Sequence, residues 1–156
     1  MTLTRDEVRD RLYAAYHALL RHDRALLELD ANERSLTHKL AEYLQGEFPD
    51  WDVDCEYNRD GDTPKRLSVQ TISTNDTDAH TVFPDIIIHY RNTKKNLVVI
   101  EAKKKSRTAD GSADKKKLKA YMTEHHYQFA FAIVFPVGPK VSDASADADI
   151  EEIDNE

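Results

Sequence analysis

The sequence lacks the features that stabilise small secreted proteins or anchor a chain in a membrane. Cys55 is its only cysteine, so no disulfide bond can form within the chain. No apolar run is long enough to cross a bilayer, and no charged and then apolar leader begins at Met1. The seven histidines show no spacing typical of zinc ligands. We therefore expect one cytoplasmic domain with no membrane partner, stabilised by its own apolar core.

The net charge of -7 is unevenly distributed along the chain. Residues 142–156 contain seven acidic residues and no Lys or Arg, and the remainder is neutral overall. Because this tail has few apolar residues, we expect residues 142–156 to be disordered and residues 1–141 to form a single domain. Residues 91–119 are rich in Lys and Arg, which predicts a basic face suited to a polyphosphate ligand. The alternative is that these lysines are ordinary solvated surface.

The spacing of apolar residues predicts an N-terminal helix over residues 5–21 and a second helix over 31–45. A strand follows Trp51, and we expect it to carry Val53, Cys55 and Tyr57 on one side. The polar region 60–80 is expected to be a long loop with room for a short extra strand. The apolar runs 82–90 and 96–103 predict a hairpin, followed by a helix over 112–125 and a buried strand over 129–135. This order predicts a mixed α/β fold, with a sheet of about four strands flanked by helices.

Two carboxylates are expected to face each other on the predicted hairpin. If residues 91–95 close a regular loop, the ladder places Asp85 opposite Glu101, where like charges destabilise a strand pair. A divalent cation such as Mg²⁺ or Mn²⁺ would compensate, because both favour oxygen ligands. Lys103 lies two residues beyond Glu101 and therefore emerges on the same face. A metal, an acid pair and an amine suit hydrolysis of a phosphate ester.

A simpler interpretation of the same residues remains open. Asp85 and Glu101 could be solvated strand ends paired with Lys103 or Arg91, and the lysines at 103–105 could all be surface residues. The position of Glu33 favours a metal site, because helical spacing puts this carboxylate in the apolar stripe formed by Leu36, Leu40 and Leu44. If its helix packs beside the hairpin, an inward-pointing Glu33 could supply a further metal ligand or hold a water. Asp54 and Glu56 line the polar side of their strand, where solvation explains both acids; the alternative is that Glu56 extends the acidic cluster.

Pro84-Asp85, followed after a strand-turn-strand spacing by Glu101-Ala102-Lys103, resembles the signature of the PD-(D/E)xK nuclease superfamily. The resemblance covers the predicted core, about residues 31–136. It implies a restriction-endonuclease-like fold of order α-β-β-β-α-β and Mg²⁺-dependent cleavage of DNA, with Mn²⁺ able to substitute. The catalytic residues that it implies are Glu33, Asp85, Glu101 and Lys103, with the three acids as metal ligands.

Further segments, Asn32-Glu33-Arg34, Asp54 to Arg59 and Pro64 to Leu67, are similar to those of uncharacterised bacterial and archaeal members. On this basis we expect accessory roles for Glu56, Arg59 and Lys65. The lysines expected to contact the DNA backbone are Lys104, Lys105, Lys115, Lys116, Lys117 and Lys119. A homodimer or a larger protein assembly would supply any sequence specificity. The alternative function is a catalytically silent module of the same fold that binds DNA or protein within an assembly.

Overall fold

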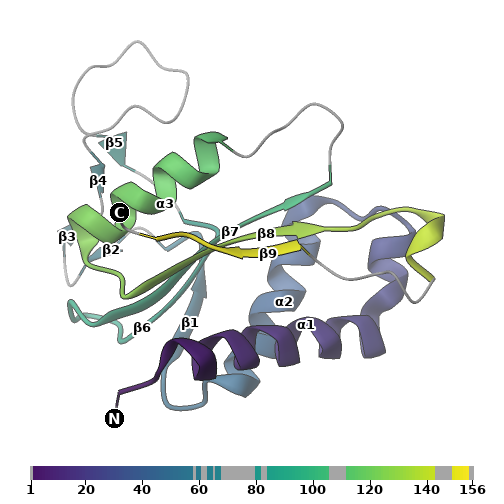
Figure 1. The fold of residues 1–156 in the computed structure, drawn as a ribbon, viewed down its shortest axis with the longest axis horizontal. Coiled ribbons are helices and arrows are strands. Elements are labelled where there is room, and N and C mark those ends of the chain that lie inside the picture. Colours follow the sequence, from purple (N-terminus) through teal and green to yellow (C-terminus); the bar gives the residue numbers. More distant parts are fainter. Residues whose placement is uncertain are drawn as a thin grey trace.

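A five-stranded mixed sheet forms the centre of the molecule (Figure 1). The computed structural model describes the backbone of residues 2–57, 59–60, 63–64, 66–67, 80–81, 84–105, 112–142 and 149–154, and most of their side chains outside 59–81. The strands lie in the order β1 (Asp52–Cys55), β6 (Ile86–His89), β7 (Asn96–Lys104), β8 (Phe129–Phe135) and β9 (Asp149–Glu152). β7 and β8 are parallel, whereas the other neighbours are antiparallel. Two separate short pairs join β2 (Arg59–Asp60) to β3 (Thr63–Pro64) and β4 (Arg66–Leu67) to β5 (His80–Thr81).

Helices cover both faces of the sheet, so the chain has the predicted mixed α/β architecture. α1 (Arg5–Glu28) and α2 (Glu33–Glu47) pack on one face, and α3 (Ser112–His125) packs on the other (Figure 1). A short 3-10 helix, η1 (Pro139–Ser142), follows β8. Among the described residues, no helix is both long enough and apolar enough to cross a membrane.

The helix boundaries follow from local capping. The Thr4 hydroxyl accepts a hydrogen bond from the Glu7 backbone N–H, and the Glu7 carboxylate accepts one from the Thr4 backbone N–H, which fixes the start of α1. α1 continues seven residues beyond its predicted end, through a kink at Asp23, because buried Leu27 packs in the core. α2 begins at Glu33, since the Asn32 side chain accepts from the Ser35 backbone at 2.8 Å.

Alternation along β7 divides the core into two clusters. Val98, Ile100 and Ala102 pack toward α1 and α2, whereas Val99 packs toward α3. On β8, large side chains (Phe131, Ile133, Phe135) fill the side of α1 and α2, and Ala130 and Ala132 lie on the side of α3. The next odd residues of β7 after Val99 therefore face α3, and they include Glu101 and Lys103.

The acidic C-terminal segment completes the sheet. β9 pairs antiparallel with β8, and Ile150 and Ile153 pack against the two core clusters. Arg5 and Arg9 pair with Glu152 at 2.8 and 2.9 Å, while Lys115 pairs with Glu151 at 3.1 Å on the opposite side. The prediction that residues 142–156 are disordered is therefore wrong for residues 149–154, because basic residues of α1 and α3 neutralise the acids. Residues 143–148 and 155–156 lie outside the described residues.

The strand β1 is shorter than its alternating pattern predicts. It ends at Cys55 because Glu56 has a φ of 51°, which breaks an extended strand. As a result Val53 packs with the cluster under α1 and α2, whereas Tyr57 packs with the cluster under α3. The prediction that Val53 and Tyr57 share one side is thus wrong.

A partly buried ionic network joins β1 to β6. Asp54 Oδ2 lies 2.7 Å from Nε2 of His89, which is buried, and Arg91 donates two hydrogen bonds to the same carboxylate at 2.9 and 2.6 Å. Burial alone would raise the pKa of Asp54, but the hydrogen bonds and charges of His89 and Arg91 lower it to about 2. The network holds the edge strand in place and does not form part of the acid pair at Glu101.

We expect Asp54→Asn to reduce the free energy of unfolding at neutral pH by about 2 kcal/mol. Because folding lowers the pKa of Asp54, its contribution is complete above about pH 4 and is lost as pH falls toward 2. Urea unfolding at pH 7 and at pH 3 measures the difference, with Asp50→Asn in the neighbouring exposed turn as the control. An equal pH dependence in wild type and Asp54→Asn would contradict this assignment.

Candidate active site

The register of β6 and β7 places Asp85 beside Glu101. Ile86 pairs with Ile100, and Asp85 directly precedes Ile86, so the ladder continued by one residue sets Asp85 opposite Glu101. The positions expected to meet therefore do meet. The pairing next to the loop differs from the prediction, because His89 rather than Tyr90 pairs with Asn96. A bulge between Ile88 and His89 then restores the expected register further along the strands.

The carboxyl groups of Asp85 and Glu101 lie against each other. Asp85 Oδ2 also accepts a hydrogen bond from the Ala102 backbone at 2.8 Å, which fixes the side chain over β7. Glu101 is only 4% exposed. Burial and the adjacent Asp85 raise the pKa of Glu101 well above its usual range. The two acids cannot both be ionised at low cost unless a cation lies beside them.

Lys117 of α3 partly supplies that positive charge. Its Nζ lies 2.8 Å from Oε1 of Glu101, and only 17% of its side chain is exposed. The contact is an ion pair without a well-directed hydrogen bond, so Oε1 has no other donor among the described residues. Lys117 was predicted to contact the DNA backbone. Instead it points at the acid pair, because Lys117 and Tyr121 lie one turn apart on the inner face of α3.

Lys103 emerges on the same face of the sheet as Glu101, as its spacing predicts. Its Nζ lies 3.6 Å from Oδ2 of Asp114 on α3, and 22% of the side chain is exposed. Asp114 was not among the predicted site residues, although it precedes Leu118 by one turn and so shares the inward face. Tyr121 of α3 is buried on the same side of the sheet. Burial and the charge of Glu101 raise the pKa of its phenol well above the ordinary value.

Glu33 lies at the mouth of the site and does not point into the core. It is the first residue of α2 and lies one turn before Leu36, where the buried stripe begins. Its side chain is exposed, so the prediction of a buried carboxylate is wrong. Even so, partial loss of water and the charges of Asp85 and then Asp114 raise the pKa of Glu33, and those of Lys104 and Lys103 oppose the shift. The four predicted catalytic residues thus lie within one electrostatic neighbourhood.

A pocket of about 500 Å³ opens beside Asp85 on the side of α2. Its lining residues are Glu33, Arg34, Thr37, His38, Cys55, Glu56 and Asp85. The exposed Glu56 pairs with Arg34 at 3.3 Å, in keeping with an accessory place near the acids. Cys55 is exposed, but partial loss of water and the charges of Glu56, Asp54 and Asp85 raise the pKa of its thiol to about 11. The pocket is therefore a region of negative potential that attracts cations.

The other predicted residues divide into paired and exposed groups. Lys104 pairs with Asp30 at 2.9 Å and Lys115 pairs with Glu151, so both are partly neutralised. Lys105, Lys116 and Lys119 are exposed, with no ion pair to any described residue. The side chains of Arg59 and Lys65 lie outside the described residues. The basic face predicted from the sequence is therefore weaker than its lysine content suggests.

Within the described residues, no three His, Cys, Asp or Glu side chains are grouped so that they could hold a metal ion. Asp85 and Glu101 provide two carboxylates in contact, and Glu33 does not join them directly. A cation at this site would therefore need backbone oxygens, water or the substrate to complete its ligands.

Comparisons with known proteins identify no family. No family model matches the chain, and no curated protein matches it in sequence. Among solved structures, the crystal structure of SSO0001 is similar, with 18% sequence identity and a TM-score of 0.46. The similarity covers 96% of this chain and 62% of that chain, so this chain spans less than two thirds of the length of SSO0001.

Proposed function

We propose that this protein is a metal-dependent phosphodiester hydrolase of restriction-endonuclease-like fold that acts on DNA. The observation that carries the proposal is that Asp85, directly before β6, lies against Glu101 of β7. Lys117 pairs with Glu101, and Lys103 emerges on the same face of the sheet. Such a cluster of acids is costly for a folded protein, and a structural role does not require it. A catalytic role accounts for both the cost and the residue types.

The acid pair fits a hard divalent cation. Both side chains offer carboxylate oxygens, and the buried Oε1 of Glu101 has only an ion pair with Lys117. Asp85 and Glu101 would hold Mg²⁺ or Mn²⁺, and the negative potential of the pocket beside Asp85 would attract the cation. When bound, the metal would polarise the phosphate and lower the pKa of a coordinated water.

The other side chains at the site would balance negative charge and orient the groups that react. Lys103 lies on the face of Glu101 and can counter negative charge that develops on a phosphate oxygen. Asp114 orients that amine through its contact at 3.6 Å. Lys117 limits the repulsion between the acids before substrate binds. Glu33, at the mouth of the site, would contribute through water or after a small movement of the first turn of α2.

We expect the pure protein to cleave DNA when Mg²⁺ or Mn²⁺ is present and to be inactive in EDTA. Plasmid, linear and branched DNA should be tested in parallel, with an RNA of matched sequence. Gel analysis of the products separates internal cleavage from removal of terminal nucleotides. Failure to cut any of these substrates with either metal would count against the proposal.

A binding module is the second candidate, and the ion pairs favour it. Lys117 and Lys103 are already paired with acids, which is the expected state of a site that is kept for stability. In that case DNA or a protein within a larger assembly would bind without hydrolysis. Metal-independent DNA binding with a steep salt dependence, and no cleavage, would support this function over the first.

A further inference from the structure

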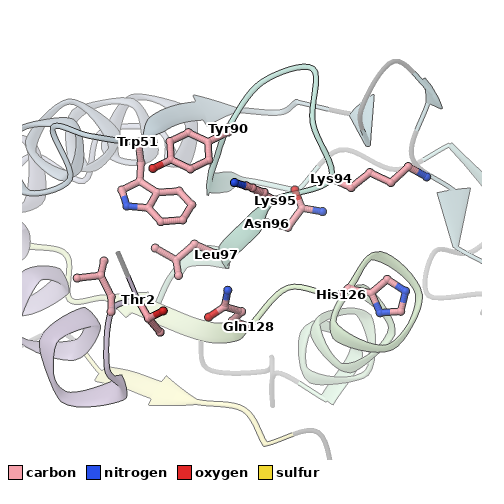
Figure 2. A pocket seen from close by; sticks show the side chains of 10 residues that line it. Thr2, Trp51, Tyr90, Lys94, Lys95, Asn96, Leu97, His126 and Gln128 are labelled. Atoms are coloured by element: carbon pink, nitrogen blue, oxygen red, sulfur yellow. The ribbon is translucent and has the colours of Figure 1, made fainter.

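A second pocket, of about 440 Å³, lies at the other end of β7 from the acid pair. Figure 2 shows Trp51 and Tyr90 at one end of this pocket and His126 at the other, with Lys95 and Asn96 between them. Asn96 begins β7 and Glu101 follows five residues later, which separates the two sites by roughly 17 Å along the strand. The pocket is thus distinct from the candidate active site.

Trp51 and Tyr90 form a rigid aromatic platform. Their rings are stacked with centroids 4.2 Å apart and planes inclined by 9°. The backbone of Trp51 is held by Gln45, whose amide donates to the Trp51 carbonyl at 2.8 Å. The backbone of Tyr90 is held by the turn, since its N–H donates to Lys95 O at 3.1 Å. Little entropy would be lost when a flat ligand stacks on this platform.

The pocket is basic although the chain as a whole is acidic. The residues that line it include Lys94, Lys95 and His126 and no Asp or Glu, whereas the net charge of the chain is -7. Lys95 Nζ lies 5.8 Å from the centre of the Tyr90 ring. No acid among the described residues pairs with Lys94 or Lys95, so both amines are available to an anion. The pocket beside Asp85, by contrast, is lined by three acids.

We propose that this pocket binds an unpaired nucleotide, with the base stacked on the Trp51 and Tyr90 platform and the phosphate at Lys94 and Lys95. A flat aromatic group and a negative charge are the two features that the pocket complements, and a nucleotide joins them covalently. The volume lies within the range of small-molecule sites. Bases inside a duplex are stacked on both faces, so only an unpaired base offers a free face to the platform.

An unpaired nucleotide can belong to a single strand or can be a free nucleotide. The hairpin turn that carries Lys94 and Lys95 is exposed, so the pocket is open to a strand that continues beyond one nucleotide. Further phosphates would then lie near the exposed turn and add to the affinity. We therefore expect a single strand to bind more tightly than a mononucleotide.

Trp51 is the only tryptophan of the chain, so its fluorescence reports this pocket directly. The titration should use Asp85→Asn protein in EDTA, so that neither cleavage nor a metal is involved. The ligands are a ten-residue oligothymidylate, thymidine monophosphate and a ten-base-pair duplex. We expect saturable quenching by the oligonucleotide, weaker binding of the mononucleotide, and little quenching by the duplex.

Two variants test the two contacts separately, with anisotropy of a labelled oligonucleotide as the measurement. Trp51→Leu should weaken binding by at least about fivefold through loss of stacking. The double variant Lys94→Gln with Lys95→Gln should weaken binding and lower the salt slope by about 0.7 for each lysine. Arg21→Gln, an exposed basic residue of α1 outside both sites, is the control and should bind as wild type does.

The outcomes separate this proposal from the proposed hydrolase function. Quenching by the mononucleotide that is as strong as by the oligonucleotide would identify a free nucleotide as the source and still support the site. Equal quenching by duplex and single strand, no quenching at all, or unchanged affinity in the double lysine variant would overturn it. Because the titration requires no cleavage, an inactive protein leaves its result unaffected.

Discussion

Asp85→Asn should reduce metal-dependent cleavage of DNA by about 10³-fold, the loss expected when a preorganised charge is removed from a reacting centre. The substitution keeps the size of the side chain, and the amide oxygen can still accept from the Ala102 backbone. Glu101→Gln should have a similar effect. Initial rates at saturating Mg²⁺ give the comparison, and Asp50→Asn, in the exposed turn before β1, should retain full activity.

The same substitution separates a catalytic loss from unfolding. In EDTA, wild-type Asp85 lies beside the buried Glu101 and raises its pKa, so removal of one charge relieves repulsion. We therefore expect Asp85→Asn to be at least as stable as wild type in a thermal melt while it is inactive. A variant that is stable and still active would exclude Asp85 from the reaction.

Lys117→Met should destabilise the metal-free protein by about 3 kcal/mol, because it leaves a buried carboxylate without its counter-charge. Methionine keeps the apolar part of the lysine side chain, so the decrease in the free energy of unfolding measures the contribution of the charge. The measurement is the free energy of unfolding in EDTA. Lys116→Met, an exposed neighbour on the same helix, should change stability by less than about 0.5 kcal/mol.

Mn²⁺ should reverse much of this defect. With Lys117 absent, the acid pair has a more negative potential, so we expect Mn²⁺ to bind more tightly to Lys117→Met than to wild type. Calorimetric titration with Mn²⁺ alone measures the affinity, and the melting temperature with and without Mn²⁺ provides a second readout. Weaker Mn²⁺ binding in Lys117→Met would show that Lys117 supports the metal site and does not compete with it.

The sequence predicts those parts of the fold in which local pattern and tertiary packing agree. α3 and β8 have the predicted bounds, because residues 112–125 have helical spacing and 129–135 form a continuous apolar run. The facing of Glu101 and Lys103 toward α3 follows from the alternation of β7 alone. Each of these features depends on residues close together in the sequence.

The features that the sequence does not predict depend on distant partners. β9 contains Ile150 among acidic residues, and its strand forms because β8 offers an open edge and Arg5 and Arg9 neutralise Glu152. No periodicity within residues 142–156 indicates those partners. Composition is a poor guide in this segment, because the charges that balance it lie outside it, on α1 and α3.

The errors at Glu33 and Lys117 have different physical causes. The stripe containing Glu33 is real, but the core ends at Leu36, and periodicity does not show how far along a helix burial extends. Lys117 lies in a run of lysines that looks uniformly solvated. Its place one turn before the buried Tyr121 is the one sequence signal that could have identified it as an inward residue.

The bulge between β6 and β7 has a consequence for how this chain tolerates changes in length. The irregular pair at His89 and Asn96 lies between the turn and the regular ladder, so an insertion at Arg91–Lys95 can be accommodated before it reaches the acids. A single deletion between Val98 and Glu101 would instead turn that glutamate toward α1 and α2, away from Lys117. The acid pair therefore tolerates changes in the length of the hairpin tip, whereas the spacing from the bulge to the glutamate must stay fixed.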